Sequence, residues 1–227
     1  MGAELRSRRR LRGLYAITPD CADTARLARL VEEALAGGAA LVQYRGKLRE
    51  ESVALDQARM LRALCHRYDA AFIVNDSIAL ALSVDADGVH LGRDDGELAA
   101  ARAALGGRIL GVSCYDQPEL ARRAARAGAD YVALGSVFAS RTKPGAVRAP
   151  LECLARARQA SGLPVAAIGG ITAANAAQAI AAGADMLAVI SSLFDAPDVR
   201  AAAGALASNF GGPDRHSENV RTQQTTV

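Results

Sequence analysis

The chain has 227 residues, of which 51% are hydrophobic and 22% are charged, and its formal net charge is +3. This length suits one large domain with a sizeable core, which excludes disorder over most of the chain. No apolar run reaches the roughly 18 residues of a membrane span, and no signal-peptide core follows the basic start. The four cysteines lack CxxC or zinc-ligand spacing, so we expect free thiols and a cytoplasmic protein without a membrane partner.

Residues 1–12 form a basic arm ahead of the first predicted strand. Its arginines are Arg6, Arg8, Arg9, Arg10 and Arg12. Such a run could contact nucleic acid, but it has no interleaved aromatic residues and no basic helix follows it. We therefore expect a solvated terminus and no nucleic-acid partner. Residues 210–227 are polar and aperiodic, which predicts a disordered tail and leaves residues 13–209 as one folded domain.

Short apolar runs alternate with amphipathic segments along this domain. The predicted strands span residues 14–17, 41–45, 72–74, 88–91, 109–113, 131–134, 164–168 and 186–190. The predicted helices span residues 23–36, 52–68, 77–82, 97–105, 118–127, 151–160 and 173–182, and a last helix ends near residue 208. Ala-Gly-Ala-Asp occurs at 127–130 and again at 182–185, each time between a helix and a strand. Glycine at that point suits a left-handed helix cap.

Strict alternation of strand and helix with short connections predicts parallel strands and right-handed crossovers. Eight such units in one domain favour an α/β fold, a single (β/α)₈ TIM barrel. An open, doubly wound sheet is the alternative, although no GxGxxG turn follows the first strand. In a barrel the carboxyl ends of all strands meet at one mouth, so polar residues there are interpreted as one site.

Two carboxylates follow successive strands of this barrel. Asn75 and Asp76 end the third strand, and Asp95 follows the fourth. Carboxylates without clustered histidine or cysteine favour a hard cation, so Asp76 and Asp95 are candidate Mg²⁺ ligands. The alternative is that each aspartate caps the helix that follows it. His90, inside the fourth strand, is expected to be packed and hydrogen-bonded rather than catalytic.

Cationic and hydroxyl side chains follow other strands. They are Gln43, Arg45 and Lys47 after the second strand, Ser113 at the end of the fifth, and Ser140, Arg141, Thr142 and Lys143 after the sixth. Arginine and lysine near a carboxylate-held cation suit a polyphosphate. The alternative for Arg45 is a structural ion pair at the barrel mouth, and the alternative for the Thr142 loop is solvent exposure without a role.

A second anion site is predicted where the last two strands end. Gly169-Gly170 lets backbone amides approach an anion, and Ile190-Ser191-Ser192 opens the last helix, which matches the phosphate pocket found in many barrels. A pair of glycines after a strand is also often only a tight turn. Two phosphorylated ligands in one mouth suggest group transfer between them.

Seven segments of the chain, in one order, resemble the motifs of the thiamine-phosphate synthase family. They are VQYRGK at 42–47, VND at 74–76, ADGVHLGRDD at 86–95, GVS at 111–113, SRTK at 140–143, IGGI at 168–171 and VIS at 189–191. The match spans nearly all of the chain between the basic arm and the polar tail. Two departures occur: Gly46 stands where the family commonly has Glu, and Ala139-Ser140 stands where it commonly has Pro-Thr.

The resemblance implies a TIM-barrel transferase with two phosphorylated small-molecule substrates. It would join 4-amino-2-methyl-5-(diphosphooxymethyl)pyrimidine to 4-methyl-5-(2-phosphooxyethyl)thiazole, giving thiamine phosphate and pyrophosphate, with Mg²⁺ held by Asp76 and Asp95. The residues implied for the pyrimidine diphosphate are Gln43, Arg45, Lys47, Asn75, Ser113 and Lys143. Those implied for the thiazole phosphate are Ser140, Thr142, Gly170, Ile190 and Ser191. Tyr44, Gly46 and Arg141, within the same motifs, complete the predicted substrate-binding set.

The chemistry implied by the resemblance is dissociative. Pyrophosphate leaves first, the amino group of the ring stabilises the remaining cation, and the thiazole nitrogen then attacks. Arg45, Lys47, Ser113 and Lys143 are the candidate catalytic residues, and no covalent nucleophile is required. A thiazole tautomerase and a non-catalytic sensor of phosphorylated ligands are the alternatives, and a homo-oligomer is left open. Retention of Asp76, Asp95, Thr142 and Lys143 favours the synthase.

Overall fold

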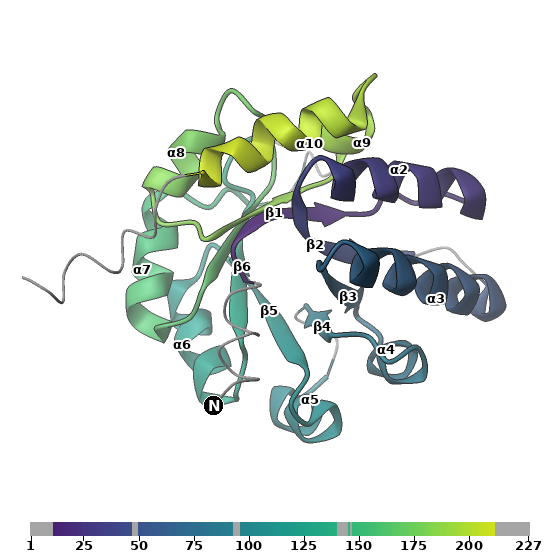
Figure 1. Cartoon of the computed structure of the whole chain (residues 1–227). Helices are drawn as coiled ribbons and strands as arrows, with labels where there is room; N and C mark the ends of the chain where they lie inside the picture. Colours follow the sequence, from purple (N-terminus) through teal and green to yellow (C-terminus); the bar gives the residue numbers. More distant parts are fainter. Residues whose placement is uncertain (1–10, 47–49, 93–95, 140–144, 146, 212–227) are drawn as a thin grey trace, which may run out of the picture.

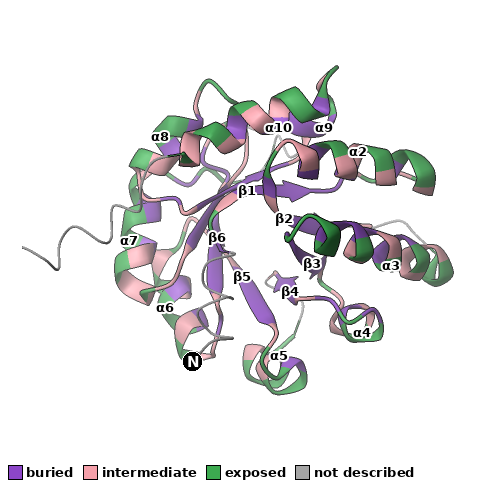
Figure 2. Cartoon of the chain, viewed as in Figure 1, coloured by how far each residue is buried: buried purple, intermediate pink, exposed green. Residues whose placement is uncertain are grey.

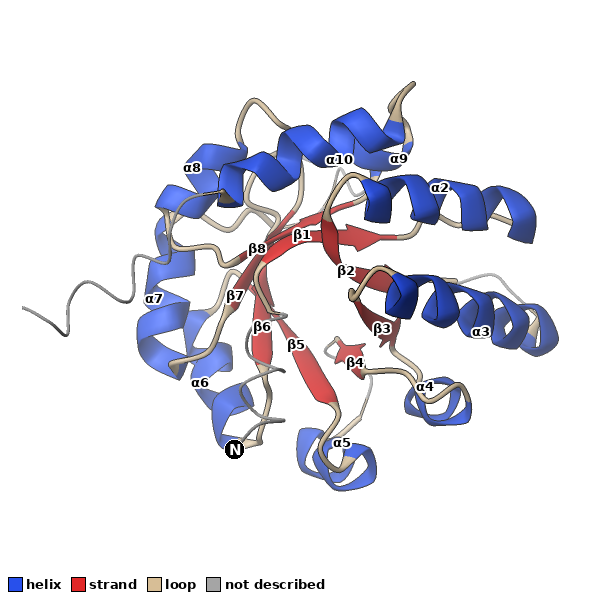
Figure 3. Ribbon diagram, viewed as in Figure 1, coloured by secondary structure: helices blue, strands red, loops and turns tan. Residues whose placement is uncertain are grey.

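The computed structural model describes residues 11–46, 50–92, 96–139, 145 and 147–211. Parallel strands close into a barrel in the order β1-β2-β3-β4-β5-β6-β7-β8, with helices around its outside (Figure 1, Figure 3). The strands are β1 (Gly13–Ile17), β2 (Ala39–Tyr44), β3 (Ala71–Asn75), β4 (Gly88–Leu91), β5 (Ile109–Tyr115), β6 (Tyr131–Leu134), β7 (Val165–Ile168) and β8 (Met186–Val189). The predicted TIM barrel is confirmed, and the open sheet is excluded.

A helix follows each strand and returns the chain to the other end of the barrel. The helices are α2 (Thr24–Ala36), α3 (Glu51–Arg67), α4 (Ile78–Ser83), α5 (Leu98–Leu105), α6 (Pro118–Arg126), α7 (Glu152–Ser161) and α8 (Ala176–Ala181). After β8 come α9 (Ser191–Phe194), α10 (Val199–Ala207) and the short η1 (Ser208–Phe210). The last predicted helix is therefore divided into two helices, α9 and α10. Asp198 starts the second of them, because its side chain caps α10 by accepting from the Ala201 N–H. None of the described helices is long and apolar enough to cross a membrane.

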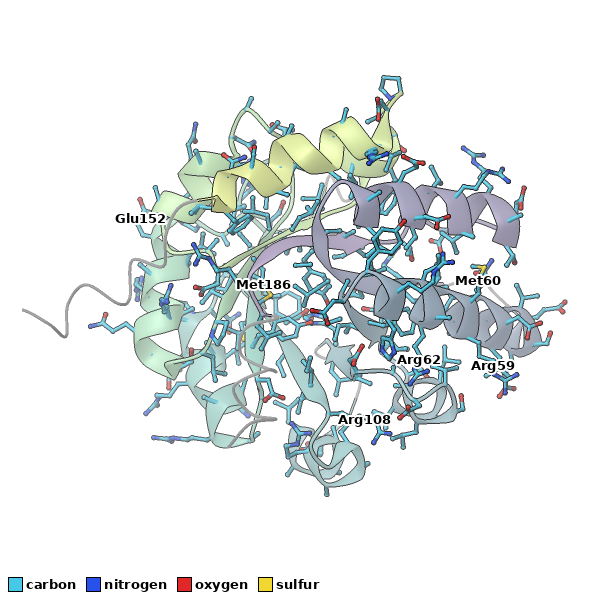
Figure 4. The ribbon with its side chains drawn as sticks, viewed as in Figure 1. Arg59, Met60, Arg62, Arg108, Glu152 and Met186 are labelled. Carbon is cyan, nitrogen blue, oxygen red and sulfur yellow. The ribbon has the colours of Figure 1, made fainter. Side chains whose placement is uncertain are left out.

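Alternate residues of each strand face two separate cores. Tyr15 and Ile17 belong to the cluster inside the barrel, whereas Leu14 and Ala16 belong to the cluster between the strands and the helices. Met186 lies in the inner cluster, near the centre of the barrel (Figure 4). The strands are consequently buried on both faces, and the helices expose only their outer surfaces (Figure 2). This alternation decides which strand residues can reach a site inside the mouth.

The barrel begins earlier in the chain than we predicted. Leu11, which we assigned to the basic arm, is 2% exposed and packs within the inner cluster. Its apolar side chain closes the end of the interior at which β1 starts, so it belongs to the barrel. Residues 1–10 of the predicted arm and 212–227 of the predicted tail lie outside the described residues.

The Ala-Gly-Ala-Asp repeat has a structural role at the amino ends of the strands. Asp130 accepts a hydrogen bond from the Leu110 N–H at 2.8 Å, and Asp185 accepts one from the Val165 N–H at 2.9 Å. Asp87 binds the Phe72 N–H in the same way, at 2.8 Å. Each aspartate therefore ties the start of its own strand to the preceding strand. These carboxylates lie at the end of the barrel opposite to Asn75 and Asp76, so they have no part in a site at the mouth.

The four cysteines are free, as predicted from their spacing. Cys65, Cys114 and Cys153 are buried, and Cys21 is half-buried. Burial raises the pKa of the Cys114 thiol to about 12, so it stays protonated and unreactive at neutral pH.

Candidate functional site

A cavity of about 890 Å³ lies at the carboxyl ends of the strands. The predicted residues that line it are Gln43, Arg45, Asn75, Ser113, Gly170, Ile190 and Ser191. They come from β2, β3, β5 and the segments after β7 and β8, so the fold brings together positions that are far apart in the sequence. Small-molecule sites typically measure roughly 300–1,000 Å³, so this cavity has room for two small ligands.

Six predicted residues lie outside the described residues. They are Lys47, Asp95, Ser140, Arg141, Thr142 and Lys143. Gly46 is described and half-buried next to Arg45, but it is not among the residues of the cavity wall.

The structure shows the ion pair that the sequence left open for Arg45, and it also places this residue at the cavity. Its backbone N–H donates to the buried Thr18 Oγ1 at 2.9 Å, which holds the residue just past the end of β2. Its guanidinium lies 3.5 Å from the Asp20 carboxylate, and its side chain is only 18% exposed. Because Arg45 also lines the cavity, the ion pair holds a cationic group in place at the mouth.

Asp76 lies at the carboxyl end of β3, directly after the cavity-lining Asn75. Its φ is +64°, and its backbone N–H donates to the His90 carbonyl at 2.9 Å. Ser77, not Asp76, occupies the N-cap of α4, where its hydroxyl accepts from the Leu80 N–H at 3.1 Å. The capping alternative is therefore wrong for Asp76, an exposed residue that follows Asn75 but is not itself among the residues of the cavity wall.

Tyr44 does not line the cavity. Strand alternation turns its side chain toward the outer core, where it is 3% exposed and its hydroxyl donates to Gln57 Oε1 at 2.9 Å. Gln57 in turn donates to the Cys21 carbonyl and to Thr24 Oγ1, at 3.1 and 3.2 Å. This corrects the prediction for Tyr44, which ties β2 to α3 and to the start of α2.

A chain of polar side chains crosses the barrel interior at the floor of the cavity, and all of its members except Tyr131 line the cavity wall. The Tyr15 and Tyr131 hydroxyls are 2.7 Å apart, and Tyr131 lies 2.9 Å from His90 Nδ1. His90 Nε2 is 2.9 Å from Ser113 Oγ, and Gln43 Nε2 donates to the Tyr15 hydroxyl at 2.7 Å. The two tyrosine rings meet edge to face, whereas His90 stacks on Tyr131. The expectation that His90 is packed and hydrogen-bonded is confirmed.

The two buried tyrosines should make the fold sensitive to alkali. Burial is the main cause that raises the pKa of Tyr15 and of Tyr131 above the ordinary value. The unfolded chain releases these protons at about pH 10, while the folded chain keeps them. Their stabilising contribution is therefore present below about pH 10 and is lost as the pH rises further, by about 1.4 kcal/mol per tyrosine and pH unit.

We expect thermal melting followed from pH 8 to 11.5 to show a steep loss of stability above about pH 10. Tyr131→Phe should flatten this loss, whereas Tyr68→Phe, at a tyrosine that is 41% exposed, should leave it unchanged. Equal slopes for the wild type and Tyr131→Phe would contradict this assignment.

The segments after β7 and β8 form the other side of the cavity. Gly169 and Gly170 have φ of +99° and +63°, and a Cβ on Gly170 would lie 2.3 Å from the Ala139 carbonyl oxygen. Asn175 donates to the Gly170 carbonyl at 3.0 Å, and the Ser192 hydroxyl donates to the Ile171 carbonyl. The glycines are therefore required for close packing of two loops. Helix α9 has only four residues, so backbone amides and hydroxyls, rather than a helix dipole, would have to bind an anion here.

Several cavity residues were missed in the sequence. They include Tyr15, Ile17, His90, Tyr115, Ser136, Val147, Thr172 and Asp195. Period-two alternation could have identified Tyr15 and Ile17, because they share one face of their strand. The others, except His90 in β4, follow irregular backbone, such as the break in register between β5 and β6 at Ser113 and Tyr115, which no sequence pattern signals.

Comparison with known proteins connects this geometry to a family. The family model described as thiamine monophosphate synthase matches residues 14–193, which include all strands of the barrel except the first residue of β1. The chain belongs to this family. A thiamine-phosphate synthase of Aromatoleum aromaticum is 60% identical over 202 residues, covering 88% of this chain and 97% of the relative. The corresponding protein of Chromobacterium violaceum is 57% identical over 203 residues, covering 89% of this chain and 98% of the relative.

A solved structure agrees with the sequence comparison. The thiamine phosphate pyrophosphorylase from Pyrococcus furiosus has a TM-score of 0.80 and 38% identity, and the match covers 90% of this chain and 96% of that one. Since relatives of this similarity are enzymes by name, the chain is an enzyme of the thiamine monophosphate synthase family.

Proposed function

We propose that this enzyme condenses 4-amino-2-methyl-5-(diphosphooxymethyl)pyrimidine with 4-methyl-5-(2-phosphooxyethyl)thiazole to form thiamine phosphate and pyrophosphate. The observation that carries the proposal is one cavity in which the family's strand-end residues converge. Gln43, Arg45, Asn75 and Ser113 line one side of it, and the Gly170 segment lines the other. One side of the cavity carries polar and cationic side chains and the other carries a glycine-containing backbone segment. Such a cavity suits two different ligands that react with each other.

The side formed by β2, β3 and β5 is proposed to bind the pyrimidine diphosphate. Gln43 is 3% exposed and Ser113 is half-buried, so their polar groups can bind a heterocycle away from bulk water. Arg45 and Asn75 lie nearer the strand ends, where the diphosphate would extend toward solvent. By the family resemblance, Lys47 and Lys143 would add cationic groups to the leaving pyrophosphate.

Asp76 and Asp95 are proposed to hold Mg²⁺ between the protein and the diphosphate. The described residues contain no cluster of three or more His, Cys, Asp or Glu side chains suited to a metal. Mg²⁺ commonly keeps several waters and binds through one or two carboxylates plus substrate phosphates, so the donor set fits this cation. Once bound, the ion would neutralise charge that develops on the leaving pyrophosphate.

The opposite side is proposed to bind the thiazole phosphate. Gly170, Ile190 and Ser191 line the cavity there, and the positive φ of Gly170 allows its backbone to approach a ligand closely. Ser140, Arg141 and Thr142 would contribute from the segment after β6, by the family resemblance.

The proposed reaction needs no covalent nucleophile. The bond between the pyrimidine methylene carbon and the diphosphate oxygen breaks, and the electron pair leaves with pyrophosphate. The thiazole nitrogen then donates its lone pair to that carbon, which gives the thiazolium of thiamine phosphate. Arg45 stabilises the departing charge, and Ser113 and Gln43 hold the pyrimidine so that the methylene carbon faces the thiazole.

The direct test is to incubate the purified chain with both phosphorylated substrates and Mg²⁺. We expect one pyrophosphate released for each thiamine phosphate formed, measured by a coupled phosphate assay and by mass spectrometry. Omitting either substrate, or adding EDTA, should abolish both signals. Isomerisation of the thiazole phosphate without pyrophosphate release would favour the tautomerase, and tight binding of both ligands without any product would favour the sensor.

A further inference from the structure

The buried hydrogen-bond chain links two of the proposed pyrimidine-binding residues. From Gln43 it passes through the Tyr15 hydroxyl, the Tyr131 hydroxyl and the His90 imidazole to Ser113. The three intermediate residues are 1%, 0% and 8% exposed, respectively. Tyr15 and His90 also line the floor of the cavity, but their hydrogen-bonding groups are engaged within the chain, so we assign the ligand to the two ends, on β2 and β5. The chain therefore joins two contacts that lie 70 positions apart in the sequence.

The direction of each hydrogen bond follows from its neighbour. Gln43 Nε2 only donates, so the Tyr15 oxygen accepts there and the Tyr15 hydrogen goes to Tyr131. The Tyr131 hydrogen is then left for His90 Nδ1, which accepts it. A neutral imidazole that accepts at Nδ1 carries its hydrogen on Nε2, and this nitrogen donates to Ser113 Oγ.

This direction fixes the orientation of the polar groups at the two ends. With one Nε2 hydrogen donated to Tyr15, the Gln43 amide is held in one orientation, and its Oε1 accepts and its second Nε2 hydrogen donates at fixed positions. With its oxygen accepting from His90, Ser113 has its hydroxyl hydrogen left to donate. To reverse the direction of the hydrogen bonds, the Gln43 amide would have to flip, both tyrosine hydroxyls would have to rotate, and His90 would have to change its tautomer, all together in a buried site. A ligand with one donor and one adjacent acceptor, such as the amino group and ring nitrogen of an aminopyrimidine, matches this pattern.

We propose that Tyr15, Tyr131 and His90 are positioning residues that fix the polarity of the pyrimidine site. They select a 4-aminopyrimidine over a 4-oxopyrimidine, in which a carbonyl oxygen and a ring N–H exchange donor and acceptor. The inference rests on the proposed function for the identity of the ligand. The hydrogen-bond direction itself is a property of the unliganded protein and can be measured without substrate.

Removing the centre of the chain should uncouple its two ends. In Tyr131→Phe, Gln43 and Tyr15 can reverse as one pair, and His90 and Ser113 can reverse as another. We expect the wild type to prefer the 4-amino diphosphate over its 4-oxo analogue by at least about 100-fold in Kd, measured by calorimetry. The preference should fall below about tenfold in Tyr131→Phe and in Tyr15→Phe.

Tyr44→Phe is the matched control, because it also removes one hydroxyl from a buried tyrosine, but outside the chain. It should keep the full preference, even if its melting temperature falls as much as that of Tyr131→Phe. An unchanged preference in Tyr131→Phe, or an equal loss in Tyr44→Phe, would overturn the proposal.

The second measurement uses the unliganded protein. The chain has three histidines, so ¹⁵N spectra of their side chains are simple, and His90→Gln identifies the signal of His90. We expect His90 as the Nε2–H tautomer in the wild type, and a mixture of tautomers in Tyr131→Phe. An Nδ1–H tautomer in the wild type would overturn the proposed direction. Failure of the proposed function would appear differently, as no binding of the 4-amino diphosphate by a wild type with the expected tautomer.

Discussion

Asp76→Asn is expected to lower kcat by at least about 100-fold, equivalent to about 3 kcal/mol of transition-state stabilisation. Asp76 is exposed directly after the cavity-lining Asn75, and Ser77 performs the helix capping that could otherwise explain it. Asparagine tolerates the φ of +64° at this position and has nearly the same shape, so the substitution removes charge without adding strain. Alanine would remove the charge and also strain the backbone at this positive φ, so it could not separate the two effects.

The measurement is steady-state turnover over a range of Mg²⁺ concentrations, together with thermal melting. We expect a higher Mg²⁺ requirement and a melting temperature within about 2 °C of the wild type. Asp69→Asn is the matched control, because Asp69 also has a positive φ, of 52°, and is exposed before the other end of the same strand. It should retain full turnover. A lower melting temperature with an unchanged Mg²⁺ response would show that Asp76 is structural.

Gly111→Ala is expected to destabilise the folded barrel. A Cβ at Gly111 would lie 2.1 Å from Cζ and 2.3 Å from the hydroxyl oxygen of Tyr131. Gly111 lies in β5, which is paired with β4 on one side and β6 on the other, so its backbone cannot retreat easily. Overpacking of this kind costs about 1–3 kcal/mol, which corresponds to a fall of roughly 2–12 °C in melting temperature for a chain of this length.

Thermal melting compared with Gly107→Ala checks this expectation, because a Cβ at Gly107 meets nothing within 4 Å. Gly107→Ala should melt within about 2 °C of the wild type. Turnover of Gly111→Ala should also fall at temperatures where it is folded, because the displaced Tyr131 ring carries a hydroxyl of the buried chain. Equal melting temperatures for the two variants would show that the barrel wall adjusts without cost.

The barrel could be predicted because its signals are local. Each strand is a short apolar run, and Gly128 and Gly183 end helices α6 and α8 with φ of +86° and +110°, as the Ala-Gly-Ala-Asp repeat indicated. The same repeat placed Asp130 and Asp185 ahead of strands. Nothing local shows that their carboxylates bind the N–H groups of neighbouring strands, because those partners are 20 residues away.

The site was predictable in part. Gln43, Arg45, Asn75 and Ser113 were identified because they occur at strand ends, and the structure brings them to one cavity. Tyr44 was wrongly included, since a motif does not separate adjacent residues that face opposite sides of a strand. The split of the last helix into α9 and α10 was missed, because Asp198 acts as a cap only in the geometry that the folded chain gives it.

The amino-acid sequence by itself determined the order of strands and helices, the closed architecture and the family, since these depend on periodicity and on contiguous motifs. Only the tertiary structure decided that Tyr15, Tyr131 and His90 join Gln43 to Ser113. Barrel closure and strand register bring five strands together at this level, and burial then requires each polar group to find a partner. Hydrogen bonds between side chains depend on which residues are close in space, and distance along the sequence does not reveal this.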